Sequence, residues 1–195
     1  MLSRLDKEAH AMAPNEPTSE RTLSDGVVVL DRFRLDDAQA QLAGEDEEHA
    51  RRFGWYPARS TLETVRTAIL GWQEQWRTGG PTRAFAVRDA YTGELVGGCE
   101  VRLRGGGLAR MSYWTFPAHR GRGLASRAVC LACSYAFREL GVKRMDLHIA
   151  ADNVASRGVA RRAGFTEENL VPPEGEEVGE AKSPMLRYNR IAPQP

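Results

Sequence analysis

Hydrophobic residues follow two different periods along this chain, and each period predicts one kind of element. Alternating or continuous apolar runs predict short β-strands. These strands are expected at residues 27–30, 84–88, 95–103, 108–114, 145–149 and 185–188, with one more beginning at Phe165. Apolar residues at helical spacing predict amphipathic helices after Thr61, from Leu124 and after Asn153, and a further helix begins at Leu35.

Turn residues set the order of these elements. Gly79-Gly80-Pro81 ends the helix that follows Thr61, residues 89–94 form a turn, and Gly105–Gly107 closes a hairpin. The helix over residues 124–140 then connects two strands, which makes that pair parallel. The sequence therefore predicts an α/β (α+β) fold, in which helices flank a mixed, mostly antiparallel sheet.

Three stretches lack these periodic patterns. The polar residues 1–22 predict a disordered tail, so residues 23–190 are expected to form a single domain. Residues 46–60 are expected to be irregular, although they include several aromatic residues. Residues 171–183 contain prolines, glycines and acidic residues and are expected to form a mobile loop.

Composition narrows the class of protein. The chain has 195 residues and a formal net charge of +1, which gives no electrostatic reason to expect a nucleic-acid partner. No segment has the apolar length of a membrane helix and no signal peptide is visible, so no membrane partner is expected. The 3 cysteines favour reduced thiols and a cytoplasmic location. Cys130 and Cys133 lie inside a predicted helix, where packing is expected rather than a metal site.

The segment from Thr115 to Ala125 carries the clearest chemical signal. A glycine-rich turn that opens a helix is an anion site, because the first N–H groups of a helix have no intrahelical partner and lie at the positive end of its dipole. Glycines also let a phosphate approach the main chain closely. We therefore expect a phosphorylated ligand to be held here. The residues concerned are Thr115, Phe116, Arg120, Gly121, Arg122, Gly123, Leu124 and Ala125.

A second motif follows about 30 residues later. Residues 152–157 read Asp-Asn-Val-Ala-Ser-Arg, and Ala163-Gly164-Phe165 comes after them. Together with Arg120-Gly121-Arg122-Gly123-Leu124-Ala125, this pair of motifs resembles the GNAT superfamily of acyl-CoA N-acyltransferases. Residues 113–117, Tyr-Trp-Thr-Phe-Pro, are similar to its RimJ/RimL-like branch. The resemblance covers roughly residues 27–188.

The resemblance implies a fold and a reaction. The sheet of a GNAT protein splays between the strand that ends at Thr115 and the strand over residues 145–149, and pantetheine lies in that opening. The implied cosubstrate is acetyl-CoA, without a metal, and the implied acceptor is a primary amine of a protein N-terminus or of a small molecule. Two alternatives stay open: a longer acyl-CoA such as succinyl-CoA, and a non-catalytic module that only binds acyl-CoA. A homodimer is also left open.

Specific residues take candidate roles under this resemblance. Main-chain N–H groups near Trp114 are candidates for the developing oxyanion. Asn153 is expected near the pantetheine and Ser156 near the sulfur as the acid, with helix capping as the alternative for this pair. Glu100 is the candidate base, and a solvated strand glutamate is the alternative that we favour.

The acceptor is expected to be selected by a loop. Trp55 and Tyr56 are adjacent aromatic residues on a segment that tends to line the acceptor pocket in this branch, although anchoring in the core is an equal alternative. A rival class is a nucleotide-binding protein that uses the glycine turn. The sequence G-x-x-x-x-G-K-[ST], which such a protein would need, is absent from the chain.

Overall fold

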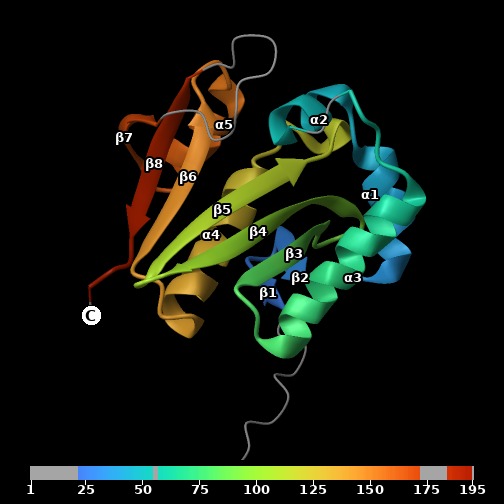
Figure 1. Cartoon of the computed structure of the whole chain (residues 1–195), viewed down its shortest axis with the longest axis horizontal. Helices are drawn as coiled ribbons and strands as arrows, with labels where there is room; N and C mark the ends of the chain where they lie inside the picture. The colour runs from blue at the N-terminus through green and yellow to red at the C-terminus, as the bar shows by residue number, and fades with distance from the viewer. Residues whose placement is uncertain (1–21, 55–56, 172–183, 195) are drawn as a thin grey trace, which may run out of the picture.

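The computed structural model describes residues 22–54, 57–171 and 184–194 of the chain. These residues form an 8-stranded sheet with the strand order β1-β2-β3-β4-β5-β6-β8-β7 (Figure 1). Its strands are β1 (Leu23–Ser24), β2 (Val28–Asp31), β3 (Thr82–Asp89), β4 (Leu95–Gly105), β5 (Leu108–Thr115), β6 (Arg144–Ala150), β7 (Thr166–Val171) and β8 (Met185–Ile191). Every pairing is antiparallel except that of β5 with β6, so the predicted fold class is confirmed.

Helices pack on both faces of this sheet. They are α1 (Ala38–Gly44), α2 (Glu47–Phe53), α3 (Leu62–Thr78), α4 (Leu124–Glu139) and α5 (Val154–Arg162). Helices α1 and α3 pack on one face, over β3 and β4, and α4 and α5 lie on the other face (Figure 1). None of the helices in the described part of the chain is long and apolar enough to cross a membrane.

The parallel pairing of β5 with β6 stops soon after it begins. Its register contains Leu108 opposite Arg144, Ala109 opposite Met145 and Arg110 opposite Asp146, and no later pair within the described strands. Strand β6 stays paired with β8 over its full length. The sheet therefore splays after Arg110, and the two strands diverge toward their C-terminal ends (Figure 1). This confirms the splay that the resemblance implied.

Two hydrophobic cores fill the space on either side of the sheet. The larger core joins the sheet to α4 and α5 and includes Met111, Leu147 and Tyr188. The smaller core joins β3 and β4 to α1 and α3 and includes Trp114 and Phe116. Successive strand residues point to opposite faces, so β5 contributes alternate residues to the two cores.

One predicted element is wrong. Residues 46–60 were expected to be irregular, but Glu47–Phe53 form α2. The helix begins because the side chain of Asp46 accepts a hydrogen bond from the N–H of His49, and it ends at Gly54 in a left-handed conformation. Ion pairs one turn apart support so short a helix. Residues 1–21 of the predicted tail (1–22) and residues 172–183 of the predicted loop (171–183) lie outside the described residues.

Candidate active site

The glycine turn has the geometry of an anion site. Gly121 and Gly123 have φ angles of 76° and 77°, a region that favours glycine, and α4 begins directly after Gly123. A Cβ atom placed on either glycine would have no other atom within 4 Å. No side chain caps the first turn of α4, so its N–H groups remain available to a ligand. The turn therefore fits a pyrophosphate group held by main-chain N–H groups.

The arginines of this turn are already paired with acids. Arg120 contacts Asp46 at 2.9 Å and Glu48 at 3.1 Å, and Arg122 contacts Asp89 at 3.0 Å. The sequence predicted that both arginines help to hold a phosphorylated ligand. In the structure, carboxylates offset much of this charge, and the helix N-terminus remains as the main attraction for an anion.

Arg162 provides a cation from a different element. It lies near the end of α5, and its Nε donates a hydrogen bond to Oγ of Ser126, in the first turn of α4, at 3.2 Å. Among the described residues it has no carboxylate partner within ion-pair distance. A phosphate at the head of α4 would therefore find this guanidinium nearby.

Main-chain groups of β5 line one side of the splay. The N–H of Phe116 donates to the carbonyl of Val96 at 2.9 Å, so this position faces β4. Because antiparallel bonds alternate along a strand, the main chain of Trp114 faces β4 too, and that of Tyr113 and Thr115 faces the splay. The carbonyl of Thr115 accepts from Arg120 on that side, which agrees with this alternation.

The side chain of Trp114 turns away from the splay into the smaller core. It is buried, and its Nε1 donates to Oε1 of Gln41 at 3.2 Å. The oxyanion donors predicted near Trp114 are thus the N–H groups of its two neighbours, Tyr113 and Thr115, rather than its own. Their role in catalysis stays a prediction.

A pair of hydroxyl groups connects β5 to α5 beside the splay. The OH of Tyr113 lies 2.6 Å from Oγ of Ser156 and donates to the main-chain oxygen of the same residue at 3.1 Å. Burial raises the pKa of Tyr113 to about 12, so this phenol keeps its proton at neutral pH. Asn153 caps α5 by accepting a hydrogen bond from the N–H of Ser156 at 3.0 Å. The cap and the phenol together fix the position of Ser156.

Tyr113 was not singled out as a functional residue from the sequence. Strand alternation places it on the same face as Met111, which predicts an ordinary core residue. The tyrosine can be recognised only once the fold brings α5, 43 positions further along the chain, against the end of β5.

Glu100 differs from the favoured expectation of a solvated glutamate. It is only 7% exposed, and Arg102 on the same strand holds its carboxylate by two bonds of 2.6 Å and 2.9 Å. Ser112 lies opposite it on β5. These residues are on the face of the sheet that α1 and α3 partly cover, whereas Ser156 is on the face of α4 and α5. The candidate acid and base thus approach the splay from opposite faces.

Helix α2 links the two sides of the splay. Arg120 ties the glycine turn to the start of α2, and Arg52 near its end donates to the carboxylate of Asp152 at 2.9 Å and 3.1 Å. Asp152 precedes α5 on the opposite side (Figure 1). Trp55 and Tyr56, the predicted acceptor residues, follow α2 and lie outside the described residues, so their role stays a prediction.

A splayed sheet with a glycine turn at the head of α4 is the arrangement that the GNAT resemblance implied. Residues 28–166 match the family described as "Acetyltransferase (GNAT) domain". This match covers more than half of the chain, and the chain belongs to that family.

Individual relatives agree with this assignment. The chain is 30% identical over 113 residues to "Probable N-acetyltransferase YjcK" and 37% identical over 112 residues to "Putative ribosomal N-acetyltransferase YdaF", both from Bacillus subtilis strain 168. The matches cover 56% of this chain, and 62% and 60% of the relatives, so the chain spans about three fifths of their length. Mycobacterium smegmatis RimJ, solved in complex with CoA-disulfide, has a similar fold, with a TM-score of 0.75 and 23% identity over 89% of this chain and 88% of RimJ.

Proposed function

We propose that this protein transfers an acetyl group from acetyl-CoA to a primary amine, with the α-amine of a polypeptide as the favoured acceptor. One observation carries the proposal. The open glycine turn at the head of α4 leads directly into the splay between β5 and β6, where two positioned hydroxyl groups lie. A ligand held by its phosphates at the turn can therefore extend along β5 toward these hydroxyls.

The binding half of the proposal uses main-chain groups. N–H groups of the first turn of α4 hold the pyrophosphate, and Arg162 adds charge from α5. The N–H of Thr115 and the C=O of Tyr113 face the splay and bond the pantetheine amides, as a neighbouring strand would. Gly121 and Gly123 keep the turn free of side chains.

The chemical half needs a proton acceptor for the amine and a proton donor for the departing sulfur. The amine nitrogen attacks the thioester carbonyl, so a C–N bond forms, the C–S bond breaks and the thiol of CoA leaves. Ser156 gives its hydroxyl proton to the departing sulfur, and its oxygen takes a proton from Tyr113, whose pKa burial raises to about 12. Glu100 accepts the proton of the amine, directly or through water. Solvent, which takes up the proton from Glu100, then returns a proton to the phenol. The N–H of Tyr113, beside Trp114, stabilises the charge on the carbonyl oxygen.

The amine class follows from acid–base chemistry and is supported by the relatives. An α-amine has a pKa near 8 and is partly neutral at physiological pH, whereas a lysine amine near 10.4 requires a stronger base. The carboxylate of Glu100 is paired with Arg102, which suits a base that only assists the removal of a proton from the amine. The relative YdaF is named as a putative ribosomal N-acetyltransferase, which is in keeping with a polypeptide substrate.

The test combines ligand binding with turnover. Acetyl-CoA at a hundred times its dissociation constant should stabilise the fold by about 2.7 kcal/mol, seen as a rise in Tm. Release of free thiol should then depend on an added peptide with an unblocked N-terminus, and a peptide with a blocked N-terminus is the matched control. Stabilisation without thiol release from any amine would identify a binding module instead. Faster thiol release from succinyl-CoA than from acetyl-CoA would mean that the transferred group is succinyl and not acetyl.

A further inference from the structure

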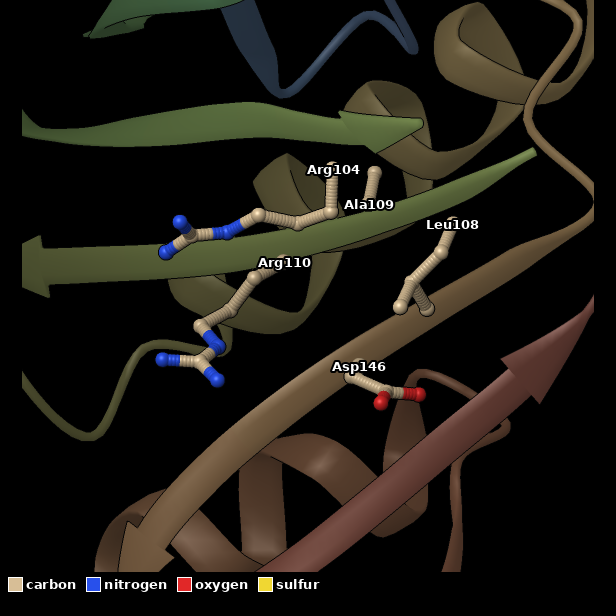
Figure 2. Close-up of a pocket in the computed structure, with 5 residues that line it drawn as sticks. All are labelled: Arg104, Leu108, Ala109, Arg110 and Asp146. Carbon is tan, nitrogen blue, oxygen red and sulfur yellow. The ribbon is translucent and has the colours of Figure 1, made fainter. Parts of the chain in front are cut away.

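The two halves of the sheet lose their main-chain connection where the splay opens. In the described strands, pairing of β5 with β6 ends at Arg110 and Asp146, and beyond these two residues the strands diverge (Figure 2). Two adjoining cavities, of about 330 Å³ and 380 Å³, lie at this point, and Arg110 and Asp146 are among the residues that line both. The width of the splay further along is therefore set by side chains and by the elements that pack on the sheet.

The first turn of α5 reaches both halves of the sheet. Ser156 is hydrogen-bonded to Tyr113 of β5, on one side of the splay. Arg157, the next residue, extends to the other side, where its Nε donates to the OH of Tyr188 on β8 at 3.1 Å. Its Nη1 donates to the carbonyl of Ala151 at 3.1 Å, in the turn that connects β6 to α5. Two neighbouring residues of one helix therefore span the opening.

Tyr188 is a fully buried residue of the larger core, and its hydroxyl group is held from two sides. The OH donates to Oε2 of Glu167 at 2.5 Å, directly opposite on β7, and accepts the hydrogen bond from Arg157. The hydrogen bond from Tyr188 lowers the pKa of Glu167, so this carboxylate stays ionised and keeps accepting. The phenol therefore has a fixed orientation and offers Arg157 one defined acceptor.

We propose that Tyr188 is a positioning residue for Ser156 and acts through Arg157. The inference rests on the function proposed above, in which Ser156 protonates the departing sulfur. Proton transfer requires the two heavy atoms to lie within about 3 Å of each other, and a displacement of about 1 Å can cost roughly 100-fold in rate. Arg157 holds α5 toward β8 while Tyr113 holds it toward β5. The hydroxyl of Ser156 is thus fixed between two opposed ties.

Removal of the Tyr188 hydroxyl should loosen one of these ties. Nη2 of Arg157 already lies 3.5 Å from Oε2 of Glu167, so in Tyr188→Phe the guanidinium can move toward this carboxylate on the edge strand β7. The start of α5 would then shift relative to β5, and Ser156 would be less well placed. The phenylalanine ring still fills the core, so the fold should remain.

The experiment is a double-mutant cycle on turnover of a peptide with an unblocked N-terminus. Tyr188→Phe should lower kcat by about threefold to tenfold, while the KM for acetyl-CoA stays near its wild-type value. In a Ser156→Ala background the same substitution should change kcat by less than about twofold, because no hydroxyl remains to be placed. A purely structural role would instead lower Tm and reduce kcat by the same factor in both backgrounds.

Tyr135→Phe is the matched control. Tyr135 is a partly buried residue of α4 that packs on the same core, against Phe85 of β3 and Trp76 of α3. This variant loses the same hydroxyl group at a distance from α5 and should keep the wild-type kcat. An equal loss of kcat in Tyr135→Phe would overturn the inference, since any missing hydroxyl in the core would then have the same effect.

Arg157→Met, which keeps an apolar stem, carries the test if Tm shows that Tyr188→Phe is unstable. It should show the same dependence on Ser156. Equal fold-losses in the two backgrounds, or an unchanged kcat in Tyr188→Phe, would overturn the inference and leave the N-acetyltransferase proposal in place. A wild-type kcat in Ser156→Ala would overturn it as well, because this hydroxyl would then need no positioning. Turnover of no amine at all would remove both proposals.

Discussion

The two faces of the sheet differ most where β5 and β6 separate. On the face of α4 and α5, the splay is bordered by a packed core, a helix N-terminus and the hydroxyl pair of Tyr113 and Ser156. On the opposite face the same opening is bordered by charged side chains, including Glu100 and Arg110, around two cavities. The first face holds the groups proposed for the acyl donor, and the second holds those proposed for the acceptor.

The two faces differ in how closely their residues are tied to the fold. The donor face consists of main-chain groups and short polar side chains whose positions follow from the fold. The acceptor face consists of long side chains from β4, β5, β6 and β8, which can change without altering the sheet. Substitutions on the first face should therefore act on acetyl-CoA binding and turnover, and those on the second face on the choice of amine.

The largest effect is expected from Gly123→Val on the donor face. A β-branched side chain at a φ of 77° is strained by about 1–2 kcal/mol and fills the space in front of the N-terminus of α4. Loss of two charge-assisted bonds to phosphate should raise the dissociation constant for acetyl-CoA by about 100-fold or more. Isothermal titration calorimetry measures this constant.

Gly141→Val is its control. Gly141 has a φ of 64° and equally open surroundings, but it lies at the other end of α4. This variant should lose similar stability and keep its affinity for acetyl-CoA. Equal losses of affinity in the two variants would mean that backbone strain, and not the position of the turn, explains the result.

A smaller effect is expected from the hydroxyl pair. Ser156→Ala should lower kcat by roughly ten- to a hundredfold while the KM for acetyl-CoA stays near its wild-type value, because the proton for the departing thiol is lost. Tyr113→Phe should give part of that loss, and the double variant should be little worse than Ser156→Ala, because the two groups act together. If the fold-loss of kcat in the double variant equals the product of the two single losses, the two groups act independently, which would contradict a shared role.

The sequence predicted the donor face far better than the acceptor face, for a physical reason. Glycines at a helix start and an Asn cap act through the main chain within a few residues, so the segments around Gly123 and Asn153 can be recognised locally. The pair of Tyr113 and Ser156, and the two cavities lined by Arg110, require strands and helices that only the tertiary fold brings together. The burial of Glu100 was missed because alternation gives the face of a strand residue, not what covers that face.

Helix α2 was missed for a related reason. Its signals are one capping aspartate and ion pairs one turn apart, and these are weak without the surface on which the helix packs. That surface includes Trp114, whose ring centre lies 6.0 Å from that of His49 and 6.0 Å from that of Phe53.

On the acceptor face, Glu100→Gln should lower kcat/KM for the amine by about tenfold near neutral pH. Without this carboxylate the amine must lose its proton to water, so its own titration near pH 8 should set the pH dependence of the rate. Thiol release measured across the pH range tests this, with Glu63→Gln on α3 as the control for the loss of a carboxylate. An unchanged profile would assign Glu100 to a purely structural pairing with Arg102.

The smallest expected effect concerns stability rather than turnover. Burial lowers the pKa of His49 below its ordinary value of 6.5, Arg120 lowers it further, and Glu45 and Asp46 oppose the shift. The unfolded chain therefore binds a proton more readily than the folded chain in the window just below pH 6.5, and stability falls as the pH falls through that window. In His49→Gln the Tm should depend less on pH between about 7 and 5. If Tm changes with pH equally in the variant and the wild type, His49 is not the source of this pH dependence.

The ion pairs of the glycine turn have a further consequence, for the response to ionic strength. Arg120 and Arg122 carry their own counterions in Asp46, Glu48 and Asp89, so a phosphate that binds at the turn competes with these carboxylates. Added salt screens the phosphate and also weakens the competing carboxylates, because these pairs are partly exposed. The two effects oppose each other. If the turn holds the phosphates of CoA as proposed, the affinity for CoA should therefore change less with salt concentration than it would if Arg120 and Arg122 had no carboxylate partners.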